Sequence, residues 1–180
     1  MKSFDLPADE AAILNAVIAD MSPVEAKPAP RASSRSAVEW GLPGICQRAR
    51  VGTVFGDLPV EALRIRDELR TSNGTIARVQ KIDTIHLDEE FLSLHPSALP
   101  VRIAANAFGA GKPAQEMLVS PQQEVSSEAH IAGRFVKAEQ LQARVGALRA
   151  SVHGATYYRF HCGEPVIIRV EGVWVRMSPW

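Results

Sequence analysis

The chain has 180 residues, of which 46% are hydrophobic and 22% charged, a composition typical of a globular domain. Its 20 basic and 20 acidic residues cancel, so neither nucleic acid nor an anionic membrane surface is expected as a partner. The apolar runs are shorter than the roughly 20 residues that span a bilayer, and residues 1–10 lack the cationic and apolar blocks of a signal peptide. We therefore expect a soluble, cytoplasmic protein.

Residues 8–21 predict a short amphipathic helix within an N-terminal unit, residues 1–21. Asp9 can cap it, and Glu10 lies in the first turn, where the helix dipole favours an acid. Its apolar residues recur at spacings of one, three and four: Ile13, Leu14, Val17, Ile18 and Met21. A helix this short is marginal alone, so its stripe must be covered. The cover is either the chain's own domain or a groove on a partner protein or second subunit.

Residues 22–37 contain three of the twelve prolines together with Ala and Ser, and they show no periodicity. This composition predicts a flexible linker between the N-terminal helix and a domain at residues 38–180. An apolar helix on such a tether is compatible with a swapped homodimer, so the oligomeric state stays open at this point.

Short β-type runs broken by turn residues follow the linker, at residues 50–55, 75–82, 100–108, 116–120, 156–162 and 165–177. Many short strands of this kind predict an all-β fold rather than βαβ units. The pair Asn73-Gly74 predicts a hairpin with a type I′ turn, in which both central residues have positive φ. The valine-rich end predicts two strands bent at Gly172, and only residues 137–150 predict a helix in this part.

No pattern for metal or cofactor binding is present, so neither is expected. The five histidines have no ligand spacing among themselves or with the two cysteines, which are also too few for a disulfide framework. Residues 108–113 look like a phosphate-binding loop, but Pro113 stands where the helix must begin, so a loop between strands is the better interpretation. The acidic run 88–90 is interpreted as a solvated loop.

Several short sequence segments, in a fixed order along the chain, resemble those of a known family. They are Arg50–Thr53 with Gly56, Leu58–Leu63, Pro100–Ile103, Met117–Gln122, Val136–Leu141, Tyr157 and Glu171-Gly172. In this order and spacing they resemble the Hint domain, the Hedgehog/intein autoprocessing module, in its bacterial form. The resemblance covers roughly residues 41–180 and implies the compact, horseshoe-like all-β fold of hedgehog C-terminal domains and inteins.

The resemblance also implies a chemistry. A cysteine thiolate at the start of the domain attacks the carbonyl of the preceding residue and converts the amide into a thioester. A histidine in a Ser/Thr-x-x-His segment supplies the proton that the departing nitrogen needs, and nearby donors stabilise the negative charge on the carbonyl oxygen. The thioester is then cleaved, passed to another nucleophile or resolved by splicing.

This chain departs from the family pattern at both chemical positions. Counting back from Arg50 without gaps, the nucleophile position falls on Gly44. Ser120 begins the Ser/Thr-x-x-His segment, and its histidine position is Gln123. Glycine offers no nucleophile, and glutamine cannot give up a proton near neutral pH. Since general acid catalysis contributes about 10²–10⁴-fold, Gln123 alone would slow scission severely. Because the residues that would make them catalytic are missing, Ser120 and Gln123 are interpreted as structural hydrogen-bonding residues in a turn set by Pro121.

Cys46 is the remaining candidate nucleophile. Along a strand it lies about 6.6 Å from position 44, well beyond the attack distance of about 3–3.5 Å. A two-residue shortening before Arg50 would restore the position and make Ile45–Cys46 the labile bond. Three hypotheses follow: a degenerate Hint domain that acts as a binding or scaffold module rather than an enzyme, an active domain that cleaves itself by an N–S acyl shift at Ile45–Cys46, and an ordinary β-sandwich binding module.

Overall fold

The computed structural model describes residues 39–128, 135–143 and 146–180. The helix expected at 8–21 and the linker at 22–37 lie outside these residues. The described strands form two antiparallel sheets. The first has the spatial order β11 (Ala147–Arg149), β7 (Val101–Ile103), β8 (Met117–Val119), β1 (Ile45–Cys46), β12 (Ala155–His161) and β6 (Lys81–Leu87). The second has the order β10 (Val136–Lys137), β9 (Glu124–Ser126), β14 (Val173–Met177), β13 (Val166–Val170), β2 (Arg50–Thr53), β4 (Glu68–Arg70) and β5 (Ile76–Arg78), with β3 (Gly56–Pro59) paired to β2.

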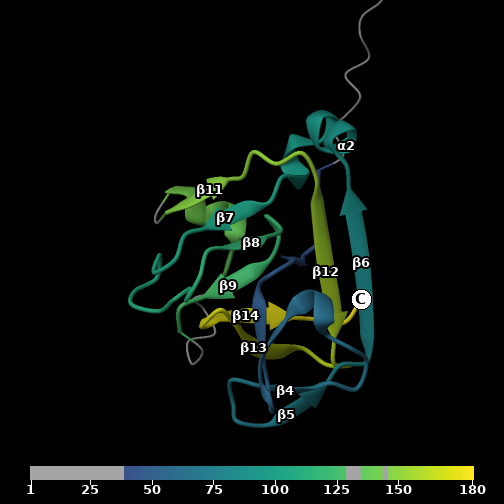
Figure 1. The fold of residues 1–180 in the computed structure, drawn as a ribbon, viewed down its shortest axis with the longest axis vertical. Coiled ribbons are helices and arrows are strands. Elements are labelled where there is room, and N and C mark those ends of the chain that lie inside the picture. Colours follow the sequence, from purple (N-terminus) through teal and green to yellow (C-terminus); the bar gives the residue numbers. More distant parts are fainter. Residues whose placement is uncertain (1–38, 129–134, 144–145) are drawn as a thin grey trace, which may run out of the picture. The chain divides into compact units, whose positions relative to one another are not determined.

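The longest strands, β6 and β12, pair along their whole length, from Ala155 opposite Leu87 to His161 opposite Lys81. In Figure 1 they run side by side along one flank, with the β4–β5 hairpin near one end of the pair and helix α2 (Glu89–Leu94) at the other. Short 3-10 helices, η1 (Val60–Ala62), η2 (Pro96–Ala98) and η4 (Ala138–Ala143), connect strands. None of the helices in the described residues is long and apolar enough to cross a membrane.

Both hairpins expected from the sequence are present, but the type I′ turn is at the second one. Strands β13 and β14 are joined by Glu171 and Gly172, whose φ angles of 49° and 82° are both positive, as a two-residue type I′ turn requires. Strands β4 and β5 are joined by a longer loop in which Gly74 has positive φ and Asn73 does not. The type I′ prediction for Asn73-Gly74 is therefore wrong, because the loop closes one residue earlier, through the hydrogen bond from the Thr71 N–H to the Thr75 carbonyl.

Two helix predictions need correction. The segment 137–150, expected as one helix, contains the 3-10 helix η4 and then strand β11, which pairs with β7. The acidic run 88–90, expected as a loop, instead begins helix α2. The Asp88 side chain caps this helix by accepting a hydrogen bond from the Phe91 N–H at 2.7 Å, and both glutamates lie in its exposed first turn, where the helix dipole favours acids. Residues 108–113 form a loop between β7 and β8, as expected.

The larger of two hydrophobic clusters draws residues from both sheets, among them Ile45, Val119 and Phe160 of the first and Val51 and Ile168 of the second. Chain order explains this arrangement, because β1 and β2 are consecutive strands in different sheets. The smaller cluster lies under helix α2. Its buried members are Cys46, Leu87, Leu92, Ala98 and Tyr157.

Candidate functional site

A small crevice lies where the segment before β1 meets β12, the start of β9 and the end of β14. Its lining includes Gly44, Gln123, Arg159, Arg176 and Trp180. Two positions that lie 79 residues apart in the sequence, Gly44 and Gln123, are therefore brought to one place. The cavity measures about 20 Å³, which is room for about one water molecule.

Gly44 is packed closely against strand β12. A Cβ atom at this position would lie 2.9 Å from the Cβ of Tyr157, closer than real Cβ atoms approach. The Tyr157 Cβ belongs to the fixed part of a fully buried side chain, whose hydroxyl donates to the Ala98 carbonyl at 2.7 Å. Position 44 therefore has no room for a side chain unless the backbone shifts.

Gln123 is buried, and its side-chain amide is bound to the backbone. Its Nε2 donates to the Arg176 carbonyl at 2.9 Å and to the Glu124 carbonyl at 3.3 Å. Its Oε1 is buried and has no hydrogen-bond partner among the described residues. The backbone N–H of Gln123 donates to the Ser120 carbonyl at 3.0 Å, which closes the turn between the two residues.

Ser120 holds the segment that leads into β1. Its hydroxyl donates to the Leu42 carbonyl and accepts from the Trp40 Nε1 at 3.0 Å, and its backbone N–H donates to the Gly44 carbonyl at 2.8 Å. Residues 40–44 are thus tied to one fully buried serine, which fixes the position of Gly44 in the crevice.

Cys46 does not line the crevice. It lies in the smaller hydrophobic cluster with Leu92, Ala98 and Tyr157, and only 3% of it is exposed. Burial away from water disfavours the thiolate and raises the pKa of Cys46 from 9.0 to about 12. Backbone pairing surrounds the Ile45–Cys46 bond, since Ile45 faces Val119 on one side and Cys46 faces Tyr157 on the other.

Arg159 is a crevice residue that the sequence analysis missed. Its side chain is 9% exposed, its Nη1 lies 3.4 Å from Asp83 Oδ2, and its guanidinium stacks 4.2 Å from the Trp180 ring centroid. Its Nε is buried and has no hydrogen-bond partner among the described residues, like the Gln123 Oε1 in the same lining. The alternation of side chains along a strand could have identified it. Arg159 follows the buried Tyr157 by two residues on β12, so both side chains lie on the same face of the sheet.

A family model for the Hint domain matches residues 43–176. The chain belongs to the Hint domain family. The family's function is autoprocessing, including protein splicing, and the all-β Hint fold expected from the sequence is confirmed, which removes the ordinary β-sandwich.

Solved structures with a similar fold are inteins and an intein-like domain. The DnaB intein from Synechocystis sp. PCC 6803 is 7% identical, with a TM-score of 0.50 over 77% of this chain and 100% of that one. The MchDnaB-1 intein (N145AA) is 12% identical, with a TM-score of 0.49 over 75% and 99%. The bacterial intein-like domain from Clostridium thermocellum is 8% identical, with a TM-score of 0.48 over 77% and 100%. Such identities show the fold alone. No curated protein sequence matches the chain.

Proposed function

We propose that this Hint domain retains the autoprocessing scaffold, has lost self-cleavage, and serves as a binding or scaffold module. The observation that carries the proposal is the composition of the crevice. Gly44 and Gln123, the residues to which the sequence analysis assigns the family's nucleophile and proton donor, both line it, and no cysteine or histidine is among the lining residues.

The chemistry of each position supports the loss. Gly44 has no side chain to attack a carbonyl, and Tyr157 occupies the space where a side chain would begin. The Gln123 amide does not titrate near neutral pH, and its donors are bound to the carbonyls of Glu124 and Arg176. Ser178 also lines the crevice, but no histidine is among the lining residues to take a proton from a serine hydroxyl.

The alternative function is cysteine-dependent self-cleavage by an N–S acyl shift at Ile45–Cys46. It requires a thiolate with access to the Ile45 carbonyl. A pKa of about 12 leaves about one Cys46 in 10⁵ as thiolate at pH 7. The bond also lies inside a strand that is paired on both sides, so strand β1 would have to separate from the sheet before attack.

Intact-mass measurement distinguishes the two functions. The purified chain is incubated at neutral pH with dithiothreitol or hydroxylamine, either of which cleaves a thioester. Loss of chemistry predicts a single species of 19.6 kDa at every time point. Release of residues 1–45 that disappears in Cys46→Ala would overturn the proposal and establish the alternative.

A further inference from the structure

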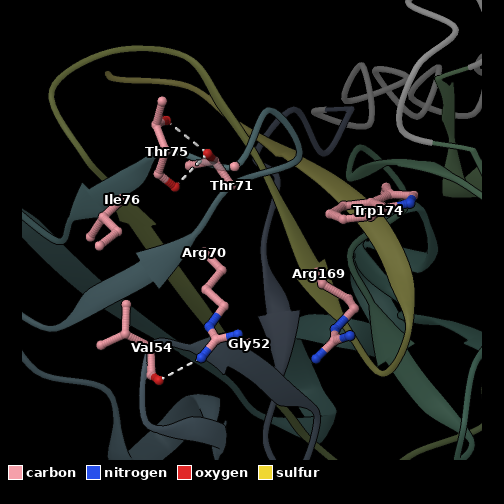
Figure 2. A pocket seen from close by; sticks show the side chains of 9 residues that line it. Gly52, Val54, Arg70, Thr71, Thr75, Ile76, Arg169 and Trp174 are labelled. Atoms are coloured by element: carbon pink, nitrogen blue, oxygen red, sulfur yellow. Dashed lines mark hydrogen bonds between the residues drawn. The ribbon is translucent and has the colours of Figure 1, made fainter.

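An open pocket on the second sheet has features of an anion-binding site. It measures about 540 Å³ and shares no lining residue with the crevice. Its lining contains two arginines, Arg70 on β4 and Arg169 on β13, and no aspartate or glutamate. Ile76 and Trp174 flank the two arginines on opposite sides (Figure 2).

Strand pairing brings the two arginines together around Gly52. Strand β2 pairs with β13 at Val51 opposite Val170, and with β4 at Thr53 opposite Leu69. Gly52 lies between these two paired positions. Arg169 directly precedes Val170 in the sequence, and Arg70 directly follows Leu69. Figure 2 shows both guanidinium groups extending toward the strand that carries Gly52.

Gly52 leaves space that a side chain would fill. A Cβ atom there would lie 3.4 Å from the Arg169 carbonyl oxygen and 3.6 Å from its Nε, the second of which belongs to the guanidinium itself. Gly52 is buried, and its φ is not in the positive region, so backbone conformation does not require glycine at this position. The missing side chain instead keeps the floor of the pocket open beside the Arg169 guanidinium.

The two guanidinium groups retain free donors. Arg70 uses one, from Nη2 to the Val54 carbonyl at 2.8 Å, and makes no ion pair with any described residue. Arg169 Nη2 lies 3.2 Å from Asp57 Oδ1, but both side chains are about half exposed, and a pair of this kind is worth little in water. Each guanidinium has five N–H donors, so most remain available to a ligand.

We propose that this pocket binds an oxyanion, a carboxylate or a phosphate monoester, attached to an apolar group. The anion accepts hydrogen bonds from Arg70 and Arg169 in the forked geometry that suits guanidinium groups. The apolar group packs against Trp174 or Ile76. The Ile76 side chain is 59% exposed and so offers apolar surface to a ligand. This inference rests on the proposed binding function and adds a class of ligand to it. Anion binding is measured independently of chain cleavage, so the two proposals can fail separately.

Amide and arginine-Nε NMR titrations of the full chain test the site with four probes. Phenyl phosphate and phenylacetate carry the two anions on one apolar body, inorganic phosphate lacks the body, and benzyl alcohol lacks the charge. We expect at least one aromatic anion to shift the Gly52 amide and the Trp174 indole, with a Kd of about 1–10 mM, typical of a small ligand. Both incomplete probes should bind more weakly. Whichever of phenyl phosphate and phenylacetate binds more tightly shows whether the site prefers a phosphate or a carboxylate.

Exposed-site variants complete the test. Arg70→Gln and Arg169→Gln should each weaken binding by about tenfold, while leaving the amide spectrum elsewhere unchanged. Arg102→Gln is the matched control, because Arg102 is an exposed arginine on β7 of the other sheet, 3.9 Å from Glu116. The proposal is wrong if neither aromatic anion shifts these signals up to about 50 mM, or if binding survives both substitutions. Either result leaves the intact-mass experiment, and thus the loss of cleavage, unaffected.

Discussion

Burial controls the reactivity of the Cys46 thiol and links it to the alkaline stability of the protein. The pKa of Cys46 is about 12 in the folded chain and 9.0 when the thiol is in water. Between these values the unfolded chain has released the proton and the folded chain has kept it, so stability is full below pH 9 and falls as pH rises toward 12. One such proton is worth about 1.4 kcal/mol per pH unit.

We expect the free energy of unfolding to fall more steeply with pH in the wild type than in Cys46→Ala. Urea denaturation at several values between pH 9 and 11 measures both slopes. Cys162, whose pKa is raised to about 11 by burial and by Glu164, contributes equally to both proteins and therefore cancels in the comparison. Equal slopes in the two proteins would contradict the burial of the Cys46 thiol.

Sequence reasoning identified crevice residues that can be found by counting along a motif, and missed those that depend on packing. Gly44 and Gln123 were selected by counting along the chain from Arg50 and from Ser120, and the structure brings both into one crevice. The tight contact between Gly44 and Tyr157, and the stacking of Arg159 on Trp180, join strands that are distant in the sequence. No local pattern encodes such contacts, so only the folded arrangement reveals them.

At the scale of single elements, the turn at Glu171-Gly172 controls the β13–β14 hairpin. Gly172 has φ of 82°, and a Cβ atom there would lie 2.7 Å from the Gly111 carbonyl oxygen. Gly172→Ala therefore meets two penalties, backbone strain in the left-handed region and a clash with another loop. We expect it to lower the free energy of unfolding by about 2–4 kcal/mol in urea denaturation.

Gly74 provides a matched control in the other hairpin. Its φ is also 82°, but apart from its two neighbours in the chain no residue has an atom within 4 Å of the position that a Cβ would occupy. Gly74→Ala should therefore cost only the backbone term, about 1–2 kcal/mol. If the two variants lost the same stability, the loop that contains Gly111 would not pack against the turn as the structure shows.

Local patterns predicted strands better than helices in this chain. Apolar alternation marks a strand that has one buried face, as in β13, where Val166, Ile168 and Val170 are buried, whereas β3 and β10 have no buried residue and were not predicted as strands. Helix α2 was missed because six residues are too few for helical periodicity to appear, although Asp88 is a regular N-cap. The segment 137–150 was misread because helix-forming side chains continue past Gly146, while β11 is held by its pairing with β7.

At the scale of the whole molecule, the two sheets share one hydrophobic core. The described residues belong to one compact unit, and the larger cluster joins Ile45 and Phe160 of the first sheet to Val51 and Ile168 of the second. Neither sheet can lose its packing without exposing the apolar face of the other. We therefore expect the domain to unfold in a single cooperative transition.

Tryptophan fluorescence tests this expectation, because Trp40 and Trp174 report on different sheets. Trp40 lies beside Tyr157 on the first sheet, with ring centroids 5.6 Å apart, and Trp174 lies on β14 of the second. One variant keeps only Trp40 (Trp174→Phe with Trp180→Phe), and the other keeps only Trp174 (Trp40→Phe with Trp180→Phe). In each variant the fluorescence midpoint in urea should coincide with the circular dichroism midpoint of that same protein. A Trp40 signal that changes before the circular dichroism would mean that the smaller cluster around Cys46 opens separately, and Cys46 would then be accessible in an otherwise folded domain.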